Sequence, residues 1–187
     1  MAASAKKAAR RALYWVMSTL VWRGPRPRAM LRNGRSLDPL FAPHEMLYLR
    51  CTLEGTETIT AADGTPYRRV RPAHIHFPDQ SVNRQKYSRP WHVLLPSDDE
   101  RSQSWILYGS AQVPVSGIPP AQQSAGNVRF EFTVEHDPLD DNFGHAELRV
   151  YKSGQRERDK RRINAVVKKT YRQLLSEQTR IALEPLV

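Results

Sequence analysis

The sequence predicts an α+β domain: an antiparallel sheet, sandwich-like or curled, covered by a long amphipathic C-terminal helix and preceded by a short basic N-terminal helix. Apolar and polar residues alternate in several segments of the middle, as in antiparallel strands with one wet face. The last segment repeats apolar residues at helical spacing, and fourteen prolines favour short elements over a helical bundle. We expect one domain, with a basic helix and arm (1–36), a β-rich body (37–152) and a helix packed on it (153–187).

Charge is distributed unevenly along the chain. Residues 1–36 contain nine lysines and arginines and no acidic residue. Residues 37–151 contain ten lysines and arginines and fifteen aspartates and glutamates. Residues 152–187 contain ten lysines and arginines and four acidic residues. A mildly acidic body therefore lies between two basic ends, and basic ends of this kind attract nucleic acid, an anionic membrane surface or an acidic protein.

The N-terminal residues 5–22 combine a basic start with an apolar continuation. On a helical wheel the cations gather on one half; they are Lys6, Lys7, Arg10 and Arg11. The apolar part, 12–22, is too short for the ~20 residues that a membrane-spanning helix needs, so we expect no integral membrane span. We expect a helix that docks on the body or binds a partner in a larger complex. An interfacial membrane helix or a targeting segment is the alternative.

Residues 23–35 form a basic linker that contains five arginines, prolines and glycines. Such a segment is either a solvated connection or an arm that follows phosphates.

The middle of the chain has the period of short strands. Leucine and cysteine side chains alternate on one side of residues 46–53, and residues 105–115 and 128–134 show the same pattern. Residues 146–150 continue it after a turn-like acidic segment, and residues 70–77 are a further candidate. The usual spacing of such elements predicts about five to seven strands.

The C-terminal segment has the clearest helical period. Its apolar residues fall on one arc of the wheel: Ile163, Val166, Val167, Tyr171, Leu174, Leu175, Ile181 and Ala182. Its cations fall on the opposite arc: Arg158, Arg161, Arg162, Lys168, Lys169, Arg172 and Arg180. We expect the apolar arc to pack on the sheet and the helix to end at Pro185. The basic arc is either a solvated face or a polyanion-binding surface.

Two of the six histidines, His74 and His76, stand two residues apart. If residues 70–77 form a strand, both imidazoles lie on one face of it. Neutral imidazole is a good ligand for zinc or iron, and His145, which opens another candidate strand, is the candidate third ligand. The alternative is that these histidines make ordinary hydrogen bonds at the sheet surface. Iron or zinc is expected only if this site exists.

Residues 71–77, R-P-A-H-I-H-F, resemble a short stretch of the intradiol ring-cleavage dioxygenases, β-sandwich enzymes that hold a non-haem ferric ion with two histidines and two tyrosines. The resemblance implies His74 and His76 as iron ligands and Tyr67 as one tyrosine. It covers seven of 187 residues. The tyrosine stands closer to the histidines than in that family, and the glycine-rich strand with the second tyrosine is missing. The two-histidine motif of the cupins is incomplete, because its glutamate is missing.

Residues 79–92 mix cations, amides and aromatic side chains in what we expect to be an ordered polar loop. Such a mixture suits phosphate contacts combined with base stacking, and the candidate contacts are Arg84, Lys86, Tyr87, Arg89 and Trp91. The alternative is a loop that its own aromatic side chains hold to the body.

These patterns predict a small basic nucleic-acid-associated protein or accessory subunit of a larger complex. The contacts would come from the N-terminal cations, from residues 79–92, and from Arg161, Arg162, Lys168, Lys169 and Arg172 on the helix. The first alternative is a His-ligated metal enzyme, dioxygenase-like or hydrolytic, and the second is a protein-interaction subunit.

The single cysteine, Cys51, lies in an apolar run, which indicates a buried side chain and favours a reducing, cytoplasmic setting.

Overall fold

The structure is a computed structural model that describes residues 29–30, 36–94, 108–124, 126–139, 142 and 144–184. The strands are β1 (Ala29–Met30), β2 (Ser36–Leu37), β3 (Met46–Thr52), β4 (Thr56–Thr60), β5 (Pro66–Val70), β6 (Gln80–Arg84), β7 (Tyr108–Pro114), β8 (Gln122–Gln123), β9 (Arg129–His136), β10 (His145–Lys152), β11 (Gln155–Arg156) and β12 (Arg180–Leu183). The helical elements are the 3-10 turns η1 (Pro72–His74), η2 (Pro90–Leu94), η3 (Val115–Gly117) and η4 (Lys160–Arg162), and the α-helix α3 (Ala165–Gln178).

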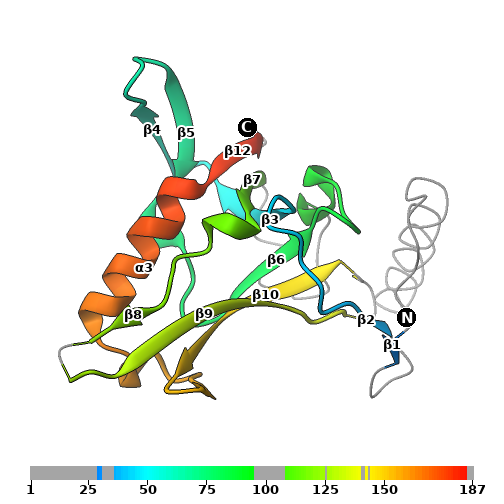
Figure 1. Ribbon diagram of the computed structural model, residues 1–187. Coiled ribbons are helices and arrows are strands. Elements are labelled where there is room, and N and C mark those ends of the chain that lie inside the picture. The colour runs from blue at the N-terminus through cyan, green and yellow to red at the C-terminus, as the bar shows by residue number, and fades with distance from the viewer. Residues whose placement is uncertain are drawn as a thin grey trace, which may run out of the picture.

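The main sheet is antiparallel and curled, with the strand order β12-β7-β3-β6-β10-β9-β8 and β11 paired to β10. Figure 1 shows the long strands β9 and β10 curving beneath the molecule, and α3 lying obliquely beside the sheet. The strands β4 and β5 form a separate hairpin that projects at the top of the view. The curled form of the predicted antiparallel sheet is therefore the one observed, as a half-barrel accompanied by a helix of 14 residues.

The hydrophobic core lies between the sheet and α3. The helix contributes Val167, Tyr171 and Leu175, which are all buried. The sheet contributes apolar side chains from several strands, including Leu47, Leu49, Val82, Ala111, Val113, Phe130, Leu148 and Val150. Cys51 belongs to the same cluster, as predicted, and burial raises the pKa of its thiol to about 11. The predicted packing of the apolar arc on the sheet is confirmed for this central part of the helix.

The segments with period-2 patterns form strands, because their alternating apolar and polar side chains point to the two faces of the sheet. In β10 the side chains of Ala146, Leu148 and Val150 are buried, and the intervening residues are more exposed. In β3 the inner residues are buried, but the strand ends at Thr52, and Leu53 is 42% exposed. In the described part of the chain the main sheet has eight strands, above the expected five to seven. The excess comes from short strands that have too few residues to show a period.

The predicted polar loop at residues 79–92 is wrong in its first part. Residues 80–84 are β6, which lies in the middle of the sheet between β3 and β10. Only Val82 shows an apolar strand signal, because the neighbouring Asn83 and Arg84 are polar yet buried. Their partners are distant in sequence: Asn142 donates to Asn83, and Arg84 pairs with residues 38–45. A buried polar strand of this kind looks like a loop in sequence.

The predicted strand at residues 70–77 is also wrong. The strand β5 ends at Val70, and the chain then enters η1. Pro72 is the first residue of this turn, where its fixed φ is tolerated and its missing N–H is not needed. Arg71 before it is extended, as a residue preceding proline prefers. The alternation of Ile75 and Phe77 with histidines therefore reflects two side chains that turn into the core from a non-strand segment.

The helix α3 ends at Gln178, not at Pro185 as predicted. Thr179 follows it in extended conformation, and the Thr179 hydroxyl donates to Ser176 O and accepts a hydrogen bond from Val70 N. This cap redirects the chain into β12, which pairs with β7. Ile181 therefore belongs to a strand, and Val166 is 71% exposed although the wheel placed it on the buried arc. The predicted N-terminal helix at residues 5–22 lies outside the described residues.

Candidate nucleic-acid interface

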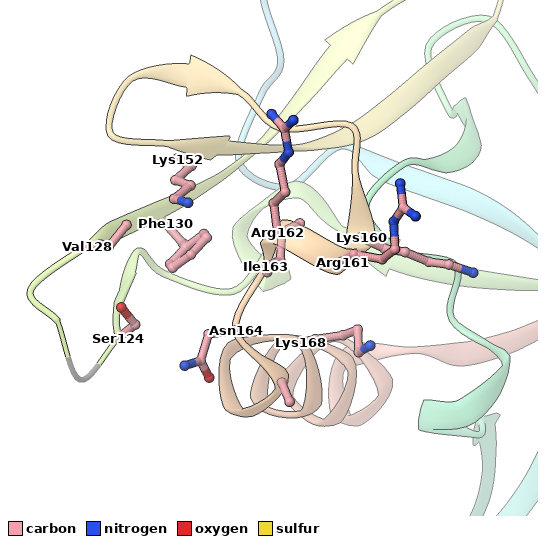
Figure 2. Close-up of a pocket in the computed structure, with 11 residues that line it drawn as sticks. Ser124, Val128, Phe130, Lys152, Lys160, Arg161, Arg162, Ile163, Asn164 and Lys168 are labelled. Carbon is pink, nitrogen blue, oxygen red and sulfur yellow. The ribbon is translucent and has the colours of Figure 1, made fainter.

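A groove lies between the first turn of α3 and the neighbouring ends of β9 and β10 (Figure 2). These strand ends meet because Lys152 pairs with Phe130 in the antiparallel register. The groove has a volume of about 550 Å³. Its cationic lining residues are Lys152, Lys160, Arg161, Arg162 and Lys168, and its other lining residues are Ser124, Val128, Phe130, Ile163, Asn164 and Ala165. As far as the structure describes the chain, the lining therefore carries five cations and no carboxylate.

Two capped turns bring the cations to this groove. The Asp159 side chain accepts a hydrogen bond from Arg161 N at 2.9 Å and so caps η4. The Asn164 side chain accepts from Val166 N at 2.8 Å and caps α3, which is a preferred role of asparagine. Between them Ile163 is buried, and it fixes the connection against the sheet. The sequence from 159 to 164 therefore places its charged side chains outward at the start of the helix.

The electrostatics of the groove are positive. Arg161 holds the Asp159 carboxylate in a two-point contact at 3.1 Å, and its hydrogen bonds keep the pKa of Asp159 below the ordinary value. Within the described residues, the ammonium groups of Lys152, Lys160 and Lys168 have no carboxylate partner. The amino end of α3 adds its partial positive charge to theirs. An anion in the groove would meet several uncompensated charges within one small region.

Three of the predicted contacts on the C-terminal segment, Arg161, Arg162 and Lys168, line this groove. Lys169 and Arg172 do not line it; Lys169 is exposed, and Arg172 lies one turn beyond Lys168 on the helix. Lys152 and Lys160 were missed. Lys160 stands in the basic run before the helix, where a signal existed, but Lys152 ends a strand, and only the strand pairing brings it here.

The predicted contacts in residues 79–92 are separated by the fold. Arg84 and Tyr87 are buried and therefore cannot offer their polar groups to an external phosphate or base. Lys86 remains 41% exposed, although its ammonium contacts Asp38 at 2.6 Å. Arg89 and Trp91 are exposed. The expectation of a single basic-aromatic surface is therefore corrected for the two buried members.

Arg84 is the centre of a buried ion-pair cluster. Its side chain is fully buried, and it makes a fork with the Glu45 carboxylate at 2.9 and 2.8 Å. The guanidinium also donates to the backbone O of Asp38 at 2.6 Å, and it stacks on the Phe41 ring at 3.7 Å. These contacts attach residues 38–45 to the middle of the sheet. Arginine suits this position because its planar fork satisfies several acceptors at once.

Asp38 completes the cluster from the other side. Its carboxylate accepts hydrogen bonds from Lys86 Nζ and Tyr87 Oη, both at 2.6 Å, and its backbone N–H donates to His136 Nδ1 at 3.0 Å. Burial alone raises the pKa of Asp38, but these hydrogen bonds and the nearby cations outweigh it and hold the pKa below the ordinary value of 3.8. Burial and the Asp38 carboxylate raise the pKa of the Tyr87 hydroxyl. The cluster is therefore more stable with Asp38 ionised than with Asp38 protonated.

This arrangement predicts a specific loss of stability in acid. Because the pKa of Asp38 is lower in the folded chain than in the unfolded one, its contribution is complete above the unfolded value and disappears as pH falls through the folded value. Asp38→Asn should be less stable at neutral pH, and its free energy of unfolding should fall less than that of the wild type between ~pH 5 and ~pH 3. Urea unfolding at several pH values measures this difference. Glu131→Gln is the control, because the Glu131 side chain is 42% exposed and lies outside the cluster. Equal pH dependence of Asp38→Asn and wild type would contradict the prediction.

The three histidines predicted as metal ligands differ in solvent exposure. His74 lies in η1 and His76 follows it, and both are exposed. His145 is buried at the start of β10, where Nδ1 lies 2.6 Å from Asp137 O. Among the described residues, no group of three histidine, cysteine, aspartate or glutamate side chains is arranged to hold a metal ion. The strand that would have aligned the first two imidazoles is absent, since these described residues form a turn.

The cations Lys6, Lys7, Arg10 and Arg11, and the partner-binding segment 5–22, lie outside the described residues. No helix in the described part of the chain is both long enough and apolar enough to cross a membrane. Comparison of the chain with protein-family models, with curated proteins and with solved structures finds no match.

Proposed function

We propose that this protein binds nucleic acid, and that the groove at the start of α3 is the contact surface. The observation that carries the proposal is that five cations from β10, η4 and α3 line one hollow. Arg161 and Arg162 contact Asp159, whereas Lys152, Lys160 and Lys168 have no carboxylate partner among the described residues. Lysine and arginine side chains that neutralise phosphates release bound counterions, which supplies most of the sequence-independent affinity for nucleic acid.

The arginines near the groove differ from the groove lysines, because they are paired with carboxylates of the protein. On the outer face of β10, Arg149 lies 3.0 Å from both Asp137 and Glu147. Arg156 lies 3.2 Å from Glu147 and from Asp79. Those arginines are neutralised within the protein, whereas the groove lysines have no such partner among the described residues. Unpaired lysines collected at one place favour an external polyanion, and they are the ones expected to carry the salt dependence.

Neutralising groove lysines should weaken binding in proportion to the number of phosphates that these lysines contact. For the double variant Lys152→Gln/Lys168→Gln, we expect affinity to fall about fivefold per lysine near physiological salt, and a salt slope that is shallower by ~0.7–0.9 for each lysine. Fluorescence anisotropy of a labelled oligonucleotide across a salt series measures both quantities. Lys152→Arg/Lys168→Arg, which keeps both charges, should bind like the wild type.

Lys169→Gln is the matched control, because it removes the same charge from the same helix one residue away from Lys168 and outside the groove lining. It should leave affinity nearly unchanged. If the control and the groove variants weaken binding equally, binding is diffuse and the groove is not the contact surface. Undetectable binding of the wild type to DNA and RNA at low salt would overturn the proposal and leave an acidic protein as the partner to test.

A further inference from the structure

The size of the groove carries information beyond its charge. A flat patch of lysines is sufficient to contact the phosphates of a duplex from outside, yet here the five cations are among the residues that line a hollow of about 550 Å³. That volume falls in the ~300–1,000 Å³ range of clefts and cavities that bind small molecules. A single phosphate group fills only a small part of it, so the groove has room for the sugar or base attached to that phosphate.

The walls of the groove offer the groups that such a unit needs. Val128, Phe130 and Ile163 supply an apolar floor. Figure 2 shows Phe130 and Ser124 on the sheet side, and Asn164 and Lys168 on the helix side. The oxygen of the Asn164 side chain is used in capping α3, which leaves its amide N–H groups as donors.

Together with the Ser124 hydroxyl on the opposite wall, these Asn164 donors place neutral hydrogen-bonding groups beside charged ones. This combination is typical of pockets that orient a ligand by a few polar groups over an apolar surface.

On the assumption that the proposed function is correct, we propose that the groove takes up one nucleotide unit of a single strand, with its phosphate among the lysines and its sugar or base against the apolar floor. A nucleotide in a duplex reaches such a hollow only after it unpairs and unstacks, which costs free energy. A nucleotide in a single strand is already unpaired, so its cost is lower. The protein should therefore prefer single-stranded to double-stranded nucleic acid.

The test compares a short mixed-sequence oligonucleotide, as DNA and as RNA, with its duplex at one salt concentration. Wild type should bind the single strand at least about tenfold more tightly. Ala165→Phe fills the groove from the helix side without changing any charge, and it should lower single-strand affinity to that of the duplex. Ser124→Phe fills it from the opposite wall and should have the same effect. Val166→Phe is the matched control, because Val166 is 71% exposed and does not line the groove.

Equal wild-type affinity for single and double strands, or unchanged selectivity in both filled variants, would overturn this inference and leave the proposed function standing. Absence of binding to either form would overturn both. Far-UV circular dichroism and urea unfolding of each variant establish that a change in selectivity does not come from unfolding.

Discussion

Replacing Arg84 with leucine is expected to lower the free energy of unfolding by ~3–5 kcal/mol, because the substitution leaves buried carboxylates without their main counter-charge. Arg84 is fully buried, and the carboxylates of Glu45 and Asp38 lie 2.8 and 3.3 Å from its guanidinium. The ammonium group of Lys86 would remain beside Asp38, whereas Lys86 reaches Glu45 only through its backbone N–H, at 3.4 Å. The same change also removes the donors that satisfy the backbone oxygens of Asp38 and Leu40.

Two further variants separate charge from geometry. Arg84→Lys keeps the charge but cannot reproduce the two-point contact with Glu45, so its destabilisation should be intermediate. Arg129→Leu removes an arginine from an exposed pair, where the two side chains are 61% and 42% exposed, and should change stability by less than ~1 kcal/mol. Urea unfolding monitored by circular dichroism gives all three values. A destabilisation below ~1 kcal/mol for Arg84→Leu would mean that the cluster contributes little to folding.

This cluster also explains why part of the fold could not be predicted. The strands β9 and β10 and the helix α3 follow from periodicity, since their apolar residues face the core at the expected spacing. The strand β6 does not, because its buried Arg84 is stabilised by a carboxylate 39 residues away along the chain. A periodicity rule assigns a buried polar residue to the surface unless its partner is known. The helix end was missed for a similar reason, as Thr179 is satisfied by Val70 in another element.

The candidate interface was predictable only in part, again because of long-range pairing. The basic run before α3 and the first cation of the helix, Lys168, are close in sequence and were identified together. Lys152 joins them through the β9–β10 register, in which it pairs with Phe130. Ser124 follows β8 and reaches the groove because β8 pairs with β9. Charge counts therefore indicated a basic C-terminal region, whereas the hollow itself, and its apolar floor, depend on the curled sheet.

Replacing Tyr171 with alanine is expected to cost ~3–5 kcal/mol of unfolding free energy, the range for removing a large aromatic side chain from a packed core. Tyr171 is 1% exposed, and its ring centroid lies 4.5 Å from that of Phe132 and 5.1 Å from that of Phe77. It thus connects α3 both to β9 and to the segment that follows η1. Burial also raises the pKa of its hydroxyl, so the phenol remains neutral at physiological pH.

Tyr171→Phe tests whether the ring or the hydroxyl carries this stability. If ring packing dominates, the phenylalanine variant should stay within ~1.5 kcal/mol of the wild type while the alanine variant does not. Lys169→Ala, at an exposed position of the same helix, should have almost no effect, since alanine is a good helix former. Because Tyr171 holds α3 against the sheet, Tyr171→Ala should also weaken the proposed nucleic-acid binding at temperatures where the variant is still partly folded. Full stability of Tyr171→Ala would show that other contacts of α3, such as those of Val167 and Leu175, are sufficient to anchor it. The position of the groove wall would then not depend on the aromatic contacts.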